Sequence, residues 1–164
     1  MIIVLNRFPT HLAKTDNKFA PNKMQKLNYQ SIYNGSLNRF GRAIVMKNMH
    51  NYLAKEFKPY LSSFKKESLT YPIEMHLELH TVYNHGSISM RKNKICWKPV
   101  KATYSPTWDL DNFADIWKKG INDVLEQEGF IKNDSVQYID GGHQKYHRVE
   151  HIDDRKLIIR LNEK

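Results

Sequence analysis

The chain has a single cysteine, Cys96, among its 164 residues. No disulfide can therefore form within it, and a lone thiol fits the reducing cytoplasm better than an oxidising compartment. No apolar run approaches the roughly 18 residues that a membrane-spanning helix needs. The opening "MIIVL" is too short for the apolar part of a secretory signal, and no basic residues precede it. We therefore expect a cytoplasmic protein that has no membrane as a partner.

Several common functional signatures are also missing. The chain has no P-loop, no G-x-G-x-x-G stretch and no Ser–His–Asp order. No repeat, linker or change of composition divides it, so we expect residues 1–164 to form one domain with one core. Hydrophobic residues make up 40% of the chain and aromatic residues 12%. That content is sufficient for folding without a stabilising metal or disulfide.

Positive charge is what the chain has in excess. Lysine and arginine number 26 against 17 acids, which gives a formal net charge of +9. Such a balance bears on partners rather than on the fold, and nucleic acid is the first candidate. On charge alone, a basic protein without a polyanionic partner remains an alternative.

The first half of the chain predicts a strand, a long loop and a helix. Residues 1–6, "MIIVLN", are typical of a short buried strand. Residues 7–38 are rich in Asn, Lys and Tyr and are expected to be irregular or mobile, and a loop of this length is more often functional than inert. Apolar residues three and four apart predict a helix over about 39–57 that ends near Pro59. Its basic residues are interpreted as a solvated face, with phosphate binding as the alternative.

The second half predicts strands around a second helix. "YPIEMHLELHTVYN", from Tyr71, alternates between apolar residues and a face of Glu and His, as in a half-buried strand. A hairpin with a basic tip, "RKNK", follows it. "DLDNFADIWKKGINDVLEQEGF" predicts a helix that Gly129 ends. The last 30 residues predict two strands with a loop between them. This order indicates an α+β fold, a single mixed or antiparallel sheet with helices packed on it.

Seven acids lie between residues 106 and 134. Asp109 and Asp111 are two apart in a segment expected to be extended, so their carboxylates share a face about 7 Å apart. Paired carboxylates suit a hard cation such as Mg²⁺, or Mn²⁺ in its place. Asp111 or Asn112 also begins the helix, where a carboxylate caps free N–H groups, so capping explains one of the two acids.

A second acidic stripe follows on the helix. Asp115, Lys119 and Asp123 are four apart and lie opposite the apolar arc of the helix. This spacing is typical of an exposed face, where each ion pair contributes about 0.2–0.5 kcal/mol. On spacing alone, Asp115 and Asp123 are interpreted as surface charges.

The order "DLDN", "NDVL" and "EGFIKNDSVQY" resembles the RusA family of Holliday-junction resolvases. The specific match covers about residues 106–138, and the flanking strands extend it loosely over 71–162. The resemblance implies a RusA-like fold and a Mg²⁺-dependent endodeoxyribonuclease that resolves four-way junction DNA by paired symmetric nicks. It also implies a homodimer in the cytoplasm of a bacterium or a phage-infected host, and such small resolvases are frequent in phages and prophages.

Compared residue by residue, Asp109 and Asp111 match the first two metal-binding acids of the family, so the resemblance implies that they bind the metal. Asp134 matches the third, the second member of an Asp–Asp pair whose first member is Asn133 here. The family lysine lies four residues after the second acid, where this chain has Asp115. Counting back four residues from the Asp of "NDVL" instead places the lysine at Lys119, with about one helical turn inserted before it.

Three questions stay open in this assignment. Lys118 is an alternative to Lys119 for the lysine that stabilises charge in the transition state. The family's N-terminal Pro-Pro-Ser-x-Asn pattern is absent from this chain. A DNA-binding protein without catalysis on the same fold is one alternative function, and a nuclease acting on flaps or replication forks is another.

The histidines of "HQKYHRVEH" are four residues apart at His143, His147 and His151. On a helix this spacing would form a metal site. The preceding glycine pair and the β-rich surroundings instead predict a strand or loop, in which four residues span about 13 Å. That distance is too long for two of these histidines to share an ion, so we predict no histidine metal site.

Overall fold

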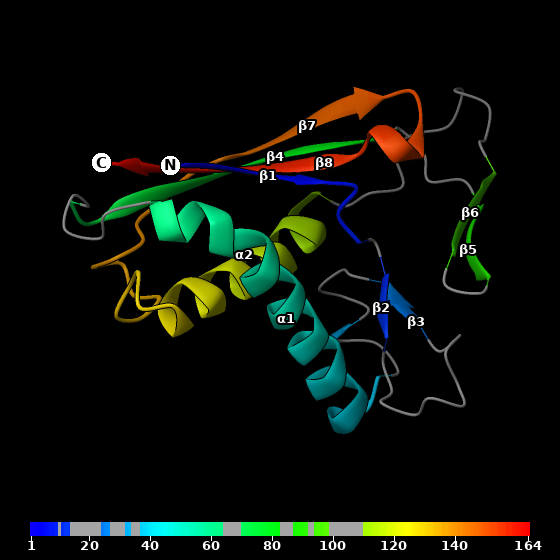
Figure 1. The fold of residues 1–164 in the computed structure, drawn as a ribbon, viewed down its shortest axis with the longest axis horizontal. Coiled ribbons are helices and arrows are strands. Elements are labelled where there is room, and N and C mark those ends of the chain that lie inside the picture. Colours follow the sequence, from blue (N-terminus) through cyan, green and yellow to red (C-terminus); the bar gives the residue numbers. More distant parts are fainter. Residues whose placement is uncertain are drawn as a thin grey trace.

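The computed structural model describes residues 1–9, 11–13, 24–26, 32–33, 37–63, 70–82, 87–91, 94–98 and 110–164. Within these residues a four-stranded sheet carries two helices on one face, with two small two-stranded sheets beside it (Figure 1). This architecture confirms the α+β class that the order of sequence patterns predicts. No helix in the described part of the chain has the length and apolar character needed to cross a membrane.

The main sheet has the strand order β1-β8-β4-β7. Its strands are β1 (Ile2–Asn6), β8 (Lys156–Glu163), β4 (Ile73–Val82) and β7 (Gln144–Val149). The β1–β8 and β8–β4 pairs are antiparallel, whereas β4 and β7 are parallel. The sheet is therefore mixed. β7 and β8 follow one another along the chain but lie on opposite sides of β4.

Helix α1 (Arg39–Ser63) is longer than the sequence predicts. It buries Val45, Met49, Leu53, Phe57 and Leu61, one residue in every four. The predicted end near Pro59 is wrong. Proline removes one backbone hydrogen bond from a helix, but burial of Leu61 in the following turn offsets that loss.

Helix α2 (Leu110–Gln127) packs beside α1 under the sheet (Figure 1). Aromatic packing holds its first half in place. The ring centroid of Phe8 lies 5.6 Å from that of Phe113 and 5.7 Å from that of Trp117. Gly129, with a φ of 68°, ends it as predicted. The Phe130 N–H donates to the carbonyl of Leu125, and the Gly129 N–H to that of Glu126. These two bonds form a Schellman motif.

The alternation predicted for β4 is confirmed. Ile73, Met75, Leu77 and Leu79 are at most 2% exposed and face the helices. Both helices lie on that side of the sheet, and the described elements leave the opposite side uncovered (Figure 1). We call this opposite side the outer face. It carries the Glu and His residues of β4.

The remaining strands form two short pairs. β5 (Ser87–Arg91) and β6 (Lys94–Lys98) are antiparallel, with Arg91 opposite Lys94, which confirms the predicted hairpin strands. β2 (His11–Ala13) and β3 (Met24–Lys26) are also antiparallel. They lie inside the segment 7–38 that we expect to be irregular, so that expectation is wrong for these six residues, whose sequences lack a clear strand pattern.

Candidate functional site

The predicted acid pair lies where α2 begins. Because α2 starts at Leu110, Asp111 belongs to its first turn, where the free N–H groups of a helix favour a carboxylate. Asp109 lies outside the described residues, and so does the side chain of Asp111. Their role as metal ligands stays a prediction.

Asp134, the predicted third ligand, lies beyond the other end of α2 and is exposed. The segment that contains it is tied to the start of β4, because Ile73 exchanges backbone hydrogen bonds with Tyr138 and Asp140. Between Asp111 and the last residue of α2, the helix rises about 24 Å. Asp134 therefore follows the last turn of α2, whereas Asp111 belongs to its first turn. The role of Asp134 as a third metal ligand stays a prediction.

The predicted lysine is engaged in an ion pair. The Nζ atom of Lys119, on the exposed face of α2, lies 3.6 Å from Asp123 Oδ1. The other oxygen of Asp123 lies 2.9 Å from Nε2 of His50 on α1. Asp123 therefore links the two helices and is more than a solvated surface charge. Asp115 is exposed, as expected, and Lys118 is partly buried.

A different set of side chains gathers on the outer face. β4 and β7 run parallel with His80 opposite His147 and Leu77 opposite Gln144. Side chains four residues apart point to the same face of a strand. His76 therefore also faces His143, just before β7 begins. Two groups result: the first group is Glu74, His76 and His143, and the second group is Glu78, His80 and His147.

The first group is a chain of hydrogen bonds. Nδ1 of His76 lies 2.6 Å from Nδ1 of His143, and Nε2 of His76 lies 3.1 Å from the carboxylate of Glu74. The backbone N–H of His143 also donates to Nδ1 of His76, at 3.2 Å. A Cβ on Gly142 would lie 1.8 Å from the carbonyl oxygen of Met75. Glycine therefore permits this close approach to β4.

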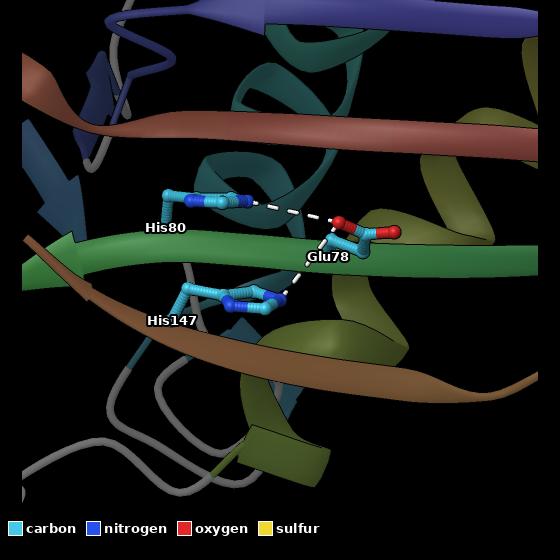
Figure 2. A group of neighbouring side chains, drawn as sticks. All are labelled: Glu78, His80 and His147. Carbon is cyan, nitrogen blue, oxygen red and sulfur yellow. Dashed lines mark ion pairs between the residues drawn. The ribbon is translucent and has the colours of Figure 1, made fainter.

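In the second group, both histidine rings approach the same carboxylate, that of Glu78, as Figure 2 shows. The Nε2 atoms of His80 and His147 each lie 3.8 Å from Oε2 of Glu78. The two rings stack with centroids 4.4 Å apart and planes 13° apart. The three ligand atoms lie within 4.8 Å of one another, a convergence that no other His, Cys, Asp or Glu group in the described residues reaches.

Charge and burial prepare these side chains to donate electron pairs. Arg160 Nε donates to Oε1 of Glu78 at 2.8 Å, and this hydrogen bond lowers the pKa of Glu78 below its usual range. Burial, and then the charges of His147 and Lys156, lower the pKa of His80. Glu78 is therefore an anion and His80 a neutral imidazole at neutral pH. Nε2 of His80 is buried without a hydrogen-bond partner.

Sequence reasoning missed the second group because it considered the histidines of one strand only. His143 lies just before β7 and His147 lies within it. Each faces a histidine of β4. The available signal was the equal spacing of the pairs His76–His80 and His143–His147, which places both pairs in register if the strands are parallel neighbours.

No model of a known protein family matches this chain, and a search among curated proteins finds no similar sequence. The resemblance to the RusA family therefore depends on the motif between residues 106 and 138. The chemistry available to the protein must be argued from its own residues.

Proposed function

We propose that the protein is a metal-dependent endodeoxyribonuclease for branched DNA, with the four-way junction as its substrate and a homodimer as its working form. The observation that carries the proposal is the D-L-D-N motif at the start of α2, in a chain with a formal net charge of +9. Paired carboxylates bind hard cations, and excess positive charge favours a polyanion.

In this proposal, Asp109 and Asp111 hold Mg²⁺ or Mn²⁺. A bound ion of this kind supplies an activated water and neutralises charge at a phosphodiester. Lys119 follows Asp111 by about two helical turns and adds positive charge near the phosphate. Its ion pair with Asp123 must open for that role. Asp134, which follows the last turn of α2, is the proposed third ligand.

A homodimer gives Asp134 a way to contribute. In a dimer, Asp134 of one copy can lie beside Asp111 of the other. Two-fold symmetry also provides two equivalent sites, which paired symmetric nicks require. The separation of these acids within one chain is therefore compatible with the assignment of all three as ligands.

The first prediction concerns Asp111. We expect Asp111→Asn to lower single-turnover cleavage of a synthetic four-way junction by about 10²-fold or more, because it removes charge that holds the cation. Junction binding, measured separately by gel shift, should persist. Asp115→Asn is the matched control, since Asp115 is an exposed acid on the same helix, and it should cleave normally. Parental cleavage by Asp111→Asn would show that the ion is held elsewhere.

Asp134→Asn tests the shared site. If both variants are inactive, mixing them should restore cleavage only when each site combines Asp111 of one copy with Asp134 of the other. One of the two sites in a mixed dimer is then intact. Sites built within one chain would each carry one substitution, and mixing would restore nothing.

A DNA-binding protein without catalysis is the second candidate. The separation of Asp134 from Asp111 and the pairing of Lys119 with Asp123 favour it. Under this candidate, the parent protein binds the junction but cleaves neither it nor linear duplex in Mg²⁺ or Mn²⁺. Faster cleavage of a flap or a fork than of the four-way junction would instead identify a nuclease with a different branched substrate.

A further inference from the structure

We propose that Glu78, His80 and His147 form a binding site for one transition-metal ion of the Zn²⁺ class on the outer face of the sheet. The site does not depend on the proposed nuclease activity and uses none of its residues. It joins β4 to β7, whereas Asp111 belongs to α2, a helix that packs on the other face of the sheet.

The donor atoms select the class of metal. Two imidazole nitrogens and one carboxylate oxygen are typical of zinc and of neighbouring divalent transition metals. Mg²⁺ and Ca²⁺ prefer oxygen ligands throughout. The site therefore differs in selectivity from the acids of the D-L-D-N motif, which offer only oxygen.

The geometry is close to that of a bound ion. Ligands at about 2.0–2.1 Å around a tetrahedral ion lie roughly 3.3 Å apart. Both Nε2 atoms are 3.8 Å from the Glu78 oxygen, and the three ligand atoms lie within 4.8 Å of one another. To bind one ion, the ligand atoms must draw together by up to about 1.5 Å, and the two rings must tilt out of their near-parallel stack. The two strands hold the three ligands in register, because His80 and His147 are directly paired in the β4–β7 ladder.

These three side chains are held by long ion pairs and by ring stacking, and no hydrogen bond joins them. A separation of 3.8 Å is too long for a hydrogen bond. Nε2 of His80 is buried with no hydrogen-bond partner, and a buried polar atom without one costs about 1–3 kcal/mol. An ion between the three ligand atoms would supply that partner. The first group needs no ion, because its contacts of 2.6–3.2 Å are hydrogen bonds.

Neighbouring residues fix the carboxylate and leave room for a further ligand. Arg160 binds Oε1 of Glu78 and leaves Oε2 directed at the two rings, which is a common way to orient a metal ligand. The side chain of His147 is 44% exposed. Water or an exogenous ligand can therefore reach the ion and complete its coordination. Lys156, whose charge acts on His80, opposes a cation, so Lys156→Ala should tighten binding.

Calorimetry on the full chain, stripped of metal with a chelator, tests the site. We expect one Zn²⁺ to bind with a Kd in the micromolar range or below and Mg²⁺ not to compete. His147→Ala should weaken binding by about 100-fold or more. The matched control is His143→Ala, which removes the histidine four residues earlier and should leave affinity unchanged. Asp111→Asn should also leave it unchanged, which separates this site from the predicted carboxylate site.

Two further readouts keep the test decisive. Co²⁺ in place of Zn²⁺ should give the visible absorption of a nitrogen- and oxygen-bound ion in the parent and not in His147→Ala. Zn²⁺ should raise the Tm of the parent through preferential binding to the folded state. If His147→Ala fails to fold, Glu78→Gln replaces it. Absence of stoichiometric binding, or equal binding by the parent and the ligand variant, would overturn the proposal.

Discussion

The first and second groups on the outer face contain the same residue types, a glutamate and two histidines, four positions apart along both strands. In the first group, the nearest ring nitrogens of the two histidines lie 2.6 Å apart and bond to each other. In the second, both Nε2 atoms instead point at one carboxylate oxygen. The comparison shows that composition and register alone do not make a metal site, because the direction of the ring nitrogens decides whether the ligands converge.

The backbone explains part of this difference. His143 precedes β7, and its N–H donates to Nδ1 of His76 instead of to a strand carbonyl. That bond turns the His76 ring so that its Nε2 meets Glu74. His147 lies inside β7, where it pairs directly with His80 in the ladder. In the second group, Arg160 therefore orients the carboxylate and ring stacking orients the two histidines.

The largest expected effect separates the two glutamates. Glu78→Gln should weaken Zn²⁺ binding by about 100-fold, because an amide oxygen is a poor replacement for an anionic ligand. Glu74→Gln, the same change four residues earlier, should leave Zn²⁺ affinity within about twofold. Calorimetric titration of both variants measures the contrast. If the Glu74 variant loses more affinity than the Glu78 variant, the assignment of the two groups is reversed.

In the metal-free protein, the free energy of unfolding should depend more on His143 than on His147. This is the reverse of their expected importance for Zn²⁺ binding. His143→Ala removes the partner of His76, which is only 8% exposed, and should lower the free energy of unfolding by about 1–2 kcal/mol. His147→Ala removes a half-exposed ring with no hydrogen bond below 3.5 Å to Glu78 and should change it by less than about 0.5 kcal/mol. Urea unfolding in the presence of a chelator measures both. Equal losses would mean that the second group is held by its own contacts.

The smallest expected effect is on the pH dependence of the free energy of unfolding of the metal-free protein. Folding lowers the pKa of His80 from its ordinary 6.5, mainly through burial, so the unfolded chain binds that proton first. The free energy of unfolding should therefore decline as pH falls below 6.5. The pKa of Glu78 is lowered from 4.5, so its stabilising contribution persists above that value and is lost in stronger acid.

Urea titrations between pH 7.5 and 5 can isolate the histidine contribution. His80→Gln should flatten the decline in stability over that range, because the variant has no ring to protonate at this position. His50→Gln is a control for the effect of a histidine outside the second group. An unchanged slope in His80→Gln would show that other groups dominate the pH dependence.

Local sequence patterns predicted much of the fold. Alternation predicted β4 with its buried and polar faces, and Gly129 marked the end of α2 correctly. These features depend on residues near one another in the chain. The continuation of α1 past Pro59 was not predictable in the same way, because it depends on burial of Leu61 in tertiary packing.

The candidate sites depend more strongly on long-range pairing. Sequence spacing indicated Asp109 and Asp111 but could not show that the segment after α2, which contains Asp134, pairs with Ile73 at the start of β4. Likewise, nothing local reveals that β7 pairs with β4 in parallel and aligns His147 with His80. That alignment requires a crossover, and crossovers are set by the packing of the whole domain.

The position of β7 at the edge of the sheet has a consequence for local opening. In the described sheet, β7 is attached through its ladder to β4 alone, whereas β8 lies between two strands. β7 can therefore detach while β1, β8 and β4 remain an antiparallel unit. Amide hydrogens of β7 should exchange with solvent through this partial opening, at a lower free energy than those of β8. An ion bound between β4 and β7 would raise the free energy needed to detach β7. It would therefore slow amide hydrogen exchange in β7 without altering exchange in β8.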